Sequence, residues 1–242
     1  MRLWQFSTKA GPGVARQATP KTGFALLLDV VARNWWELIQ LNLLVILLSL
    51  PLVTLPAAIV AATRICALML DDRPVYLGRD FVEAFRNRFW KATALGVLAI
   101  AATGLSGYAA WIFLQAAKSS LLLALPLTIS AATAVFAAIT SAHAFALCAR
   151  SDLPLAQLLR LALLGALAKP LPSLAALGFV ALLWALHVVF YPVSIFMPAI
   201  INFSIGTLAV TFGVHEATAR LLARERAGNS AAYAGGSAQR AR

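Results

Sequence analysis

The sequence is poor in charged residues and contains only two cysteines. Asp, Glu, Lys and Arg make up 12% of the 242 residues, whereas 61% are hydrophobic. A typical soluble domain has about twice that share of charge. Cys66 and Cys148 stand in no spacing typical of a metal or redox site, so we interpret both as packing residues. This composition excludes an ordinary soluble domain and predicts a polytopic membrane protein.

The motifs of common catalytic and nucleotide-binding sites are also missing. The sequence has no Gly-rich phosphate loop that ends in Lys-Ser or Lys-Thr, and no Gly-x-Ser-x-Gly turn. His215 and Glu216 begin like a His-Glu-x-x-His zinc motif, but Ala219 stands where the second His is required. We therefore expect no catalytic, cofactor-binding or metal-binding residue, no cofactor and no enzymatic activity.

Three long apolar regions remain, and each fits a pair of helices. No charged residue occurs from Leu38 to Thr63 or from Pro170 to Val214, and only Lys118 is charged from Ala92 to Ala149. A crossing helix needs about 20 apolar residues. The second and third regions are too long for one crossing each, and Lys118 and Tyr191-Pro192 interrupt them near their centres.

The first region is ambiguous by length, and the distribution of basic residues decides its topology. The stretch LSLPLVTLPAAIVAATR, from Leu48 to Arg64, contains Pro51 and Pro56, which suit a tight bend between two short helices. If each region is a hairpin, all but Lys118 of the 20 Lys and Arg residues fall on one side. Basic residues concentrate in short cytoplasmic loops, so this side is predicted to be the cytoplasm. The net charge of +11 is thus explained without nucleic acid.

The predicted fold is an all-α polytopic membrane protein with six transmembrane helices arranged as three hairpins. Each hairpin is preceded by a cytoplasmic interfacial amphipathic segment; these segments lie near 24–37, 78–92 and 151–162. The first 23 residues lack the apolar core of a cleavable signal peptide. We expect a cytoplasmic tail over 1–21, a membrane domain over 22–226 and a disordered cytoplasmic tail over 227–242.

A few polar side chains fall inside the predicted membrane helices and are candidate functional residues. Arg64 lies close enough to the basic side to extend its guanidinium toward the interface. His187 lies deeper, where it forms either a helix-to-helix hydrogen bond or a ligand or proton site. Asn42 and Asn202 suit hydrogen bonds between helices.

The first 95 residues resemble the YesL family of bacterial membrane proteins. The shared motifs are Leu-Asn-Leu-Leu, Leu-Pro-x-Val-Thr, Pro-Ala and Asp-Phe-x-x-Ala-Phe with a following basic residue and a final Phe; here they fall at Leu41 to Leu44, Leu50 to Thr54, Pro56-Ala57, Asp80 to Arg86 and Phe89. On this resemblance Pro51, Thr54, Pro56, Phe85 and Arg86 are candidate partner-contact residues. Leu55 and Arg88 depart from the family pattern, which often has Gly and Asn there.

The resemblance implies a six-helix protein of the bacterial inner membrane, with the lipid bilayer and carbohydrate ABC importer permease subunits as partners. We expect a non-catalytic accessory subunit of an oligosaccharide ABC import system, because Val82 to Phe85 is only a partial match to the loop motif with which importer permeases bind their ATPase. The alternative is a stand-alone transporter or channel for a small solute, with His187 and Asn202 along its path.

Overall fold

The computed structural model describes residues 22–117 and 121–240, and within this part of the chain the secondary structure is helical. The predicted tail over 1–21 and the charged residue Lys118 lie outside the described residues. The elements are α1 (Phe24–Arg33), α2 (Trp35–Ser49), η1 (Leu52–Thr54), α3 (Leu55–Leu70), α4 (Leu77–Ala116), η2 (Leu121–Leu123), α5 (Ala124–Arg150), α6 (Leu155–Ala168), α7 (Pro170–Val189), η3 (Pro198–Asn202) and α8 (Phe203–Arg240).

Several of these helices are suited to a membrane. Among the described residues, five are long and apolar enough to cross one, and a sixth span results if α1 and α2, which meet at 82°, are counted as one broken span. The all-α prediction is confirmed at this level. The two apolar hairpins predicted from the second and third regions correspond to α4 with α5 and to α7 with the first half of α8.

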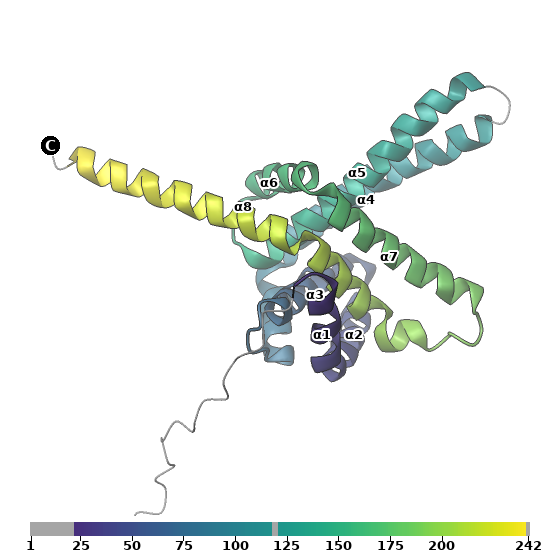
Figure 1. Ribbon diagram of the computed structural model, residues 1–242, viewed down its shortest axis with the longest axis horizontal. Helices are drawn as coiled ribbons and strands as arrows, with labels where there is room; N and C mark the ends of the chain where they lie inside the picture. Colours follow the sequence, from purple (N-terminus) through teal and green to yellow (C-terminus); the bar gives the residue numbers. More distant parts are fainter. Residues whose placement is uncertain (1–21, 118–120, 241–242) are drawn as a thin grey trace, which may run out of the picture.

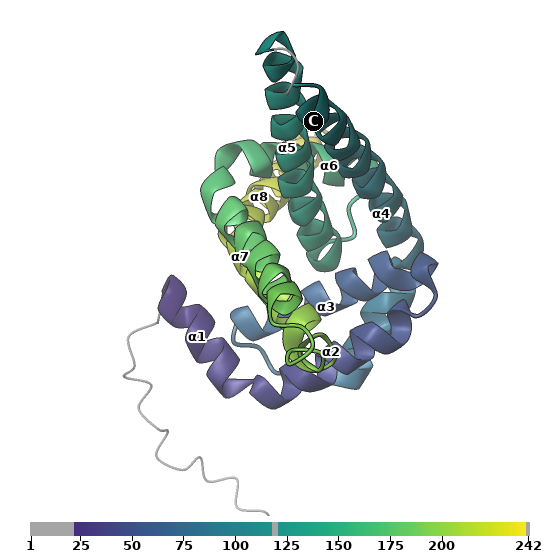
Figure 2. The same cartoon turned by 90° about the vertical axis from the view of Figure 1, so that its right-hand side faces the viewer.

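The hairpins diverge from a common centre. Figure 1 shows the α4/α5 tip and the loop that follows α7 as two separate projections on the right, while the C-terminal end of α8 extends to the left. Figure 2 shows α1 and α2 as a bent pair at the base of the molecule. The outer halves of α4 and α7 therefore expose large apolar side chains such as Leu105, Trp111 and Leu182. Such surfaces are expected to face lipid or a partner.

Helix α3 is the centre of the core. Every residue from Pro56 to Leu70 except Ile59 and Arg64 is buried. Ala58, Ala61, Ala62 and Ile65 pack against α2, α4 and α8, and Ala57 and Val60 face α4, α5 and α6. Such small side chains allow neighbouring backbones to approach closely, which is how helices pack where no water drives them together.

The predicted interfacial helix over 78–92 is not a separate element. Residues 77–116 form one continuous helix, α4, whereas breaks do separate α1 from α2 at Asn34 and α6 from α7 at Lys169. The local sequence explains why two of the segments are separate helices and the third is not. Pro170 begins α7 and cannot donate to a preceding turn, and the Asn34 amide bonds back to the Val30 carbonyl at 2.9 Å. No Gly or Pro occurs between Phe89 and Leu95, so the helix continues.

Helix α8 extends into the C-terminal segment, and its backbone is helical to Arg240. The disordered tail that the sequence predicts over 227–242 stays a prediction. The segment is rich in alanine, the strongest helix former, and it continues an existing helix, so no new nucleation is needed.

The bend between α2 and α3 lies beside the middle of α4. A Cβ atom at Gly96 would overlap the ring of Pro56, so these two residues fix the approach of α3 to α4. The stretch from Gly96 to Ala116, at about 1.5 Å per residue, leaves about 30 Å of α4 beyond this contact. The first hairpin therefore ends well short of the α4/α5 tip.

We predict that Gly96→Ala destabilises the protein by about 1–3 kcal/mol, because the added methyl group overpacks the contact with Pro56. The measurement is the thermal unfolding midpoint of the purified protein in detergent. Gly104→Ala on the same helix is the control, since a Cβ there meets nothing within 4 Å and alanine gains up to about 1 kcal/mol in a helix. Equal effects of the two substitutions would contradict this packing.

Candidate functional site

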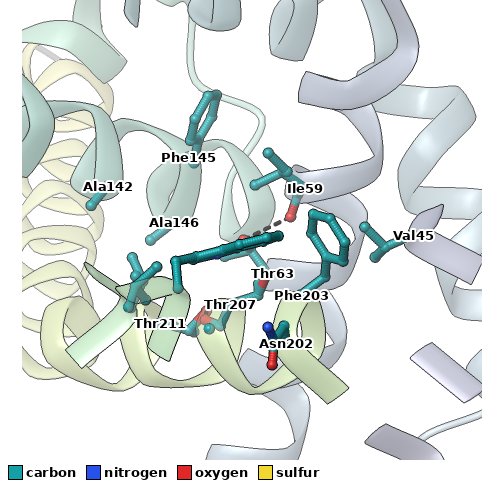
Figure 3. Close-up of a pocket in the computed structure, with 14 residues that line it drawn as sticks. Val45, Ile59, Thr63, Ala142, Phe145, Ala146, Asn202, Phe203, Thr207 and Thr211 are labelled. Atoms are coloured by element: carbon teal, nitrogen blue, oxygen red, sulfur yellow. Dashed lines mark hydrogen bonds between the residues drawn. The ribbon is translucent and has the colours of Figure 1, made fainter. Parts of the chain in front are cut away.

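A cavity of about 180 Å³ lies where α2, α3, α5, α7 and α8 meet. It is central among the apolar helices, and Figure 3 shows the side chains that surround it. The lining residues are Val45, Ile59, Thr63, Ala142, Phe145, Ala146, Val180, Trp184, Asn202, Phe203, Gly206, Thr207, Val210 and Thr211.

The polar groups of this cavity come mainly from α8 and from η3, the turn before it. Figure 3 shows Asn202, the last residue of η3, followed by Thr207 and Thr211 along α8, with Thr63 of α3 above them. The hydroxyl of Thr63 donates to the Ile59 carbonyl at 2.8 Å, and that of Thr211 donates to the Thr207 carbonyl at 2.7 Å. These two hydroxyls therefore retain acceptor lone pairs but no free hydrogen.

Asn202 is the least satisfied polar side chain of the cavity. Its side chain is 2% exposed, and neither Oδ1 nor Nδ2 has a hydrogen-bond partner among the described residues. Leaving a buried amide unpaired costs about 1–3 kcal/mol. Asn202 therefore has a buried donor and a buried acceptor that no described residue uses.

Aromatic rings form the apolar part of the cavity lining. The indole of Trp184 and the ring of Phe203 meet edge to face with their centroids 5.5 Å apart. Both line the cavity, and Trp184 keeps 37% of its surface exposed. An apolar ring beside an amide and hydroxyls suits a small neutral molecule with one polar edge.

Asn42 holds the beginning of α8 in place. Its Nδ2 donates to the carbonyls of Pro198 and Ala199 at 3.0 and 2.7 Å. Its Oδ1 accepts from the backbone N–H groups of Phe203 and Ser204 at 2.9 and 3.1 Å. The π-helical turn η3, which starts at Pro198, disrupts the regular backbone bonding here. One fully buried amide thus serves four backbone groups, which is the interhelical role predicted for Asn42.

His187 bonds within its own hairpin instead of to another helix. Its Nδ1 lies 3.0 Å from the Ser194 hydroxyl, which also donates to the His187 carbonyl at 2.8 Å. Both residues belong to the end of α7 and the loop after it. His187 is not among the residues that line the central cavity, whereas Asn202 is.

The remaining residues that the sequence suggested as functional lie near the two ends of α3. Thr54 donates to the carbonyls of Leu48 and Pro51 and so closes the bend between α2 and α3. Pro56 packs on α4, as described above.

At the opposite end of α3, Arg64 is half-buried beside the first turns of α4. Phe85 is packed against the core and contacts Phe89 edge to face at 5.7 Å, whereas Arg86 is exposed. The predicted residues therefore do not form one site.

A network of ion pairs at this end of the molecule was not predicted from the sequence. Arg150 at the end of α5 contacts Asp71 at 2.9 Å and the Nδ1 atom of His215 at 2.9 Å, and His215 Nε2 lies 3.4 Å from Asp71. Lys169 contacts Glu216 at 2.5 Å. We call the region of these residues the charged end. In the sequence, each of these residues stands at the end of an apolar run or just beyond it, and this position is the signal that could have located the network.

The arrangement of the cavity is suited to binding a small molecule. Among the residues that the structure describes, no three His, Cys, Asp or Glu side chains are grouped so that they could hold a metal ion. The cavity supplies an amide, hydroxyls and aromatic rings, which recognise a neutral polar group.

One comparison with known proteins gives a match. A family model described as a protein of unknown function, DUF624, matches residues 38–109. The matched region runs from α2 to the outer part of α4 and includes the bend closed by Thr54. Neither the comparison with curated proteins nor that with solved structures finds a match.

We predict that Asn42→Ala lowers the thermal unfolding midpoint markedly, because it removes the partners of four backbone groups in an apolar environment. The loss is expected to exceed about 1 kcal/mol. Asn202→Leu is the matched control, since it removes a buried amide without a partner and is expected to be neutral or stabilising. A larger loss for Asn202→Leu than for Asn42→Ala would contradict the assignment.

Proposed function

We propose that this chain is a non-catalytic protein of the bacterial inner membrane, with both termini in the cytoplasm, that serves as an accessory subunit of a carbohydrate ABC import system. The resemblance to the YesL family is the first support. The match at residues 38–109 covers the same motifs, from Leu41 to Phe89, on which that resemblance rests.

The observation that carries the proposal is an open groove beside α4 and α5. It has a volume of about 310 Å³, and small residues of α4 and α5 contribute to its lining, among them Gly96, Ala99, Ala138 and Ser141. Small side chains let a second helix approach closely. Helix α4 also presents a wide apolar surface beyond this groove, which is open to lipid or to a partner helix.

The partial permease motif supports the accessory role over that of a standard permease. Val82 and Phe85 lie inside the continuous helix α4, where Phe85 packs against the core. Because this segment is part of a helix, it does not correspond to the loop with which a permease binds its ATPase. The chain is therefore proposed to bind the permease subunits through its apolar helices.

The tagged full-length protein, purified in mild detergent, is expected to bring sugar permease subunits and an ATPase with it. Ala138→Phe is expected to reduce their recovery several-fold, because the ring fills the groove against which a partner helix packs. The amounts are measured by quantitative mass spectrometry of the purified sample.

Ala132→Phe provides the control, since Ala132 is an exposed residue of α5 outside the groove. The recovery of permease subunits and ATPase with the Ala132→Phe variant should be unchanged. Reproducible absence of permease subunits, together with normal oligosaccharide uptake in a deletion strain, would overturn the accessory role.

The second candidate is a stand-alone transporter or channel, and the unpaired amide of Asn202 in the central cavity favours it. On this view the protein alone in liposomes transports a small neutral solute. Asn202→Leu is expected to abolish most of the flux, whereas His187→Ala, whose side chain does not line the cavity, should retain it. Absence of flux for sugars and other small neutral solutes counts against this candidate.

A further inference from the structure

A second hollow, which we call the arginine pocket, lies at the charged end and takes no part in the proposals above. Its volume is about 460 Å³. It is formed by the last turns of α3, the connection to α4, the first turns of α4 and the connection from α5 to α6. The lining residues are Arg64, Leu68, Arg73, Pro74, Tyr76, Arg79, Asp80, Glu83, Ala84, Asn87, Arg88 and Asp152.

Four arginines face this pocket, and the side chains of three of them have no hydrogen-bond or ion-pair partner among the described residues. These three are Arg64, Arg73 and Arg79. Arg88 is used structurally: it contacts Asp152 at 3.3 Å and donates to the carbonyls of Cys148 and Ser151. The pocket therefore contains guanidinium groups whose donors are free.

The carboxylates of the pocket do not neutralise these groups pairwise. Asp80 accepts a hydrogen bond from the Tyr76 backbone N–H at 2.9 Å, and Asp152 contacts Arg88. Glu83 makes no ion pair or hydrogen bond with another described residue. The lining carries four arginines against three carboxylates and remains positive.

Gathering like charges in this way is unfavourable without an anion. Arg64 is half-buried and lies within electrostatic range of three arginines, Arg73, Arg88 and Arg150, and of one carboxylate, Asp80. Guanidinium groups present several donors in a planar fork, which matches the oxygens of a phosphate group. A phosphate group would accept hydrogen bonds from the three free arginines and offset their repulsion.

The position of the pocket points to a lipid as the source of the phosphate. The pocket lies at the end of apolar helices, where lipid headgroups lie, and its lining includes an exposed aromatic ring, that of Tyr76, which is 67% exposed. Trp90, two residues after Arg88 on α4, is 81% exposed. Such rings favour the membrane interface, and basic pockets at this level bind anionic headgroups. We propose that the arginine pocket binds the phosphate of an anionic membrane lipid.

The test measures lipid binding to the full-length protein in detergent, by native mass spectrometry and by the thermal unfolding midpoint, with phosphatidylglycerol and with zwitterionic phosphatidylcholine. Phosphatidylglycerol is expected to bind and to raise the midpoint, and phosphatidylcholine is not. Arg73 and Arg79 are exposed, so their substitution should leave the fold intact. The double variant Arg73→Gln/Arg79→Gln is expected to weaken phosphatidylglycerol binding by about 10- to 30-fold.

The control is Arg86→Gln/Arg224→Gln, which removes the same net charge from exposed arginines outside the pocket and should leave binding unchanged. Glu83→Gln should strengthen binding, because it removes a negative charge from the site. Equal weakening by both double variants would overturn the proposal, since it would indicate a general charge effect. The lipid assignment would equally be overturned if inorganic phosphate at millimolar concentration raised the midpoint as much as phosphatidylglycerol does.

Discussion

Backbone polar groups within an apolar environment must find partners inside the chain, and the amide of Asn42 meets this requirement at the most irregular point of the fold. Regular helices satisfy their own N–H and C=O groups, so they need no help in lipid. The π-helical turn at Pro198 does not, and Asn42 bonds four of the groups around it. This side chain bonds the first apolar region to the third, and it links α2 to the beginning of α8.

The general architecture could be predicted from the sequence because it depends on where charges are absent. The bends at Pro51 and at Tyr191-Pro192 were predicted from proline and from the positions of basic residues. The continuity of α4 was not predicted, because an amphipathic pattern followed by an apolar one is typical of an interfacial helix followed by a separate membrane helix. Only the lack of a breaker between Phe89 and Leu95 distinguishes one helix from two.

The candidate residues show the same division between local and long-range information. The interhelical role of Asn42 followed from its position in an apolar run, but its partners are more than 150 residues away in sequence and could not be named. Asn202 was chosen for the same reason, yet its amide has no partner among the described residues. Asp71, Arg150 and His215 each sit near the end of an apolar helix, and only the folded chain brings them together.

The unequal lengths of the two long hairpins bear on how the protein sits in a bilayer of uniform thickness. The apolar part of α4, from Ala92 to Ala116, measures about 37 Å, whereas the 20 residues of α7 measure about 30 Å. A bilayer core of about 30 Å matches α7 upright, whereas the longer α4 is accommodated by tilting, by kinking or by local thickening of the bilayer. The divergence of the hairpins in Figure 1 agrees with such a difference in inclination. Thicker membranes would let α4 stand more upright and change the angle between the two arms, which makes their spread sensitive to lipid chain length.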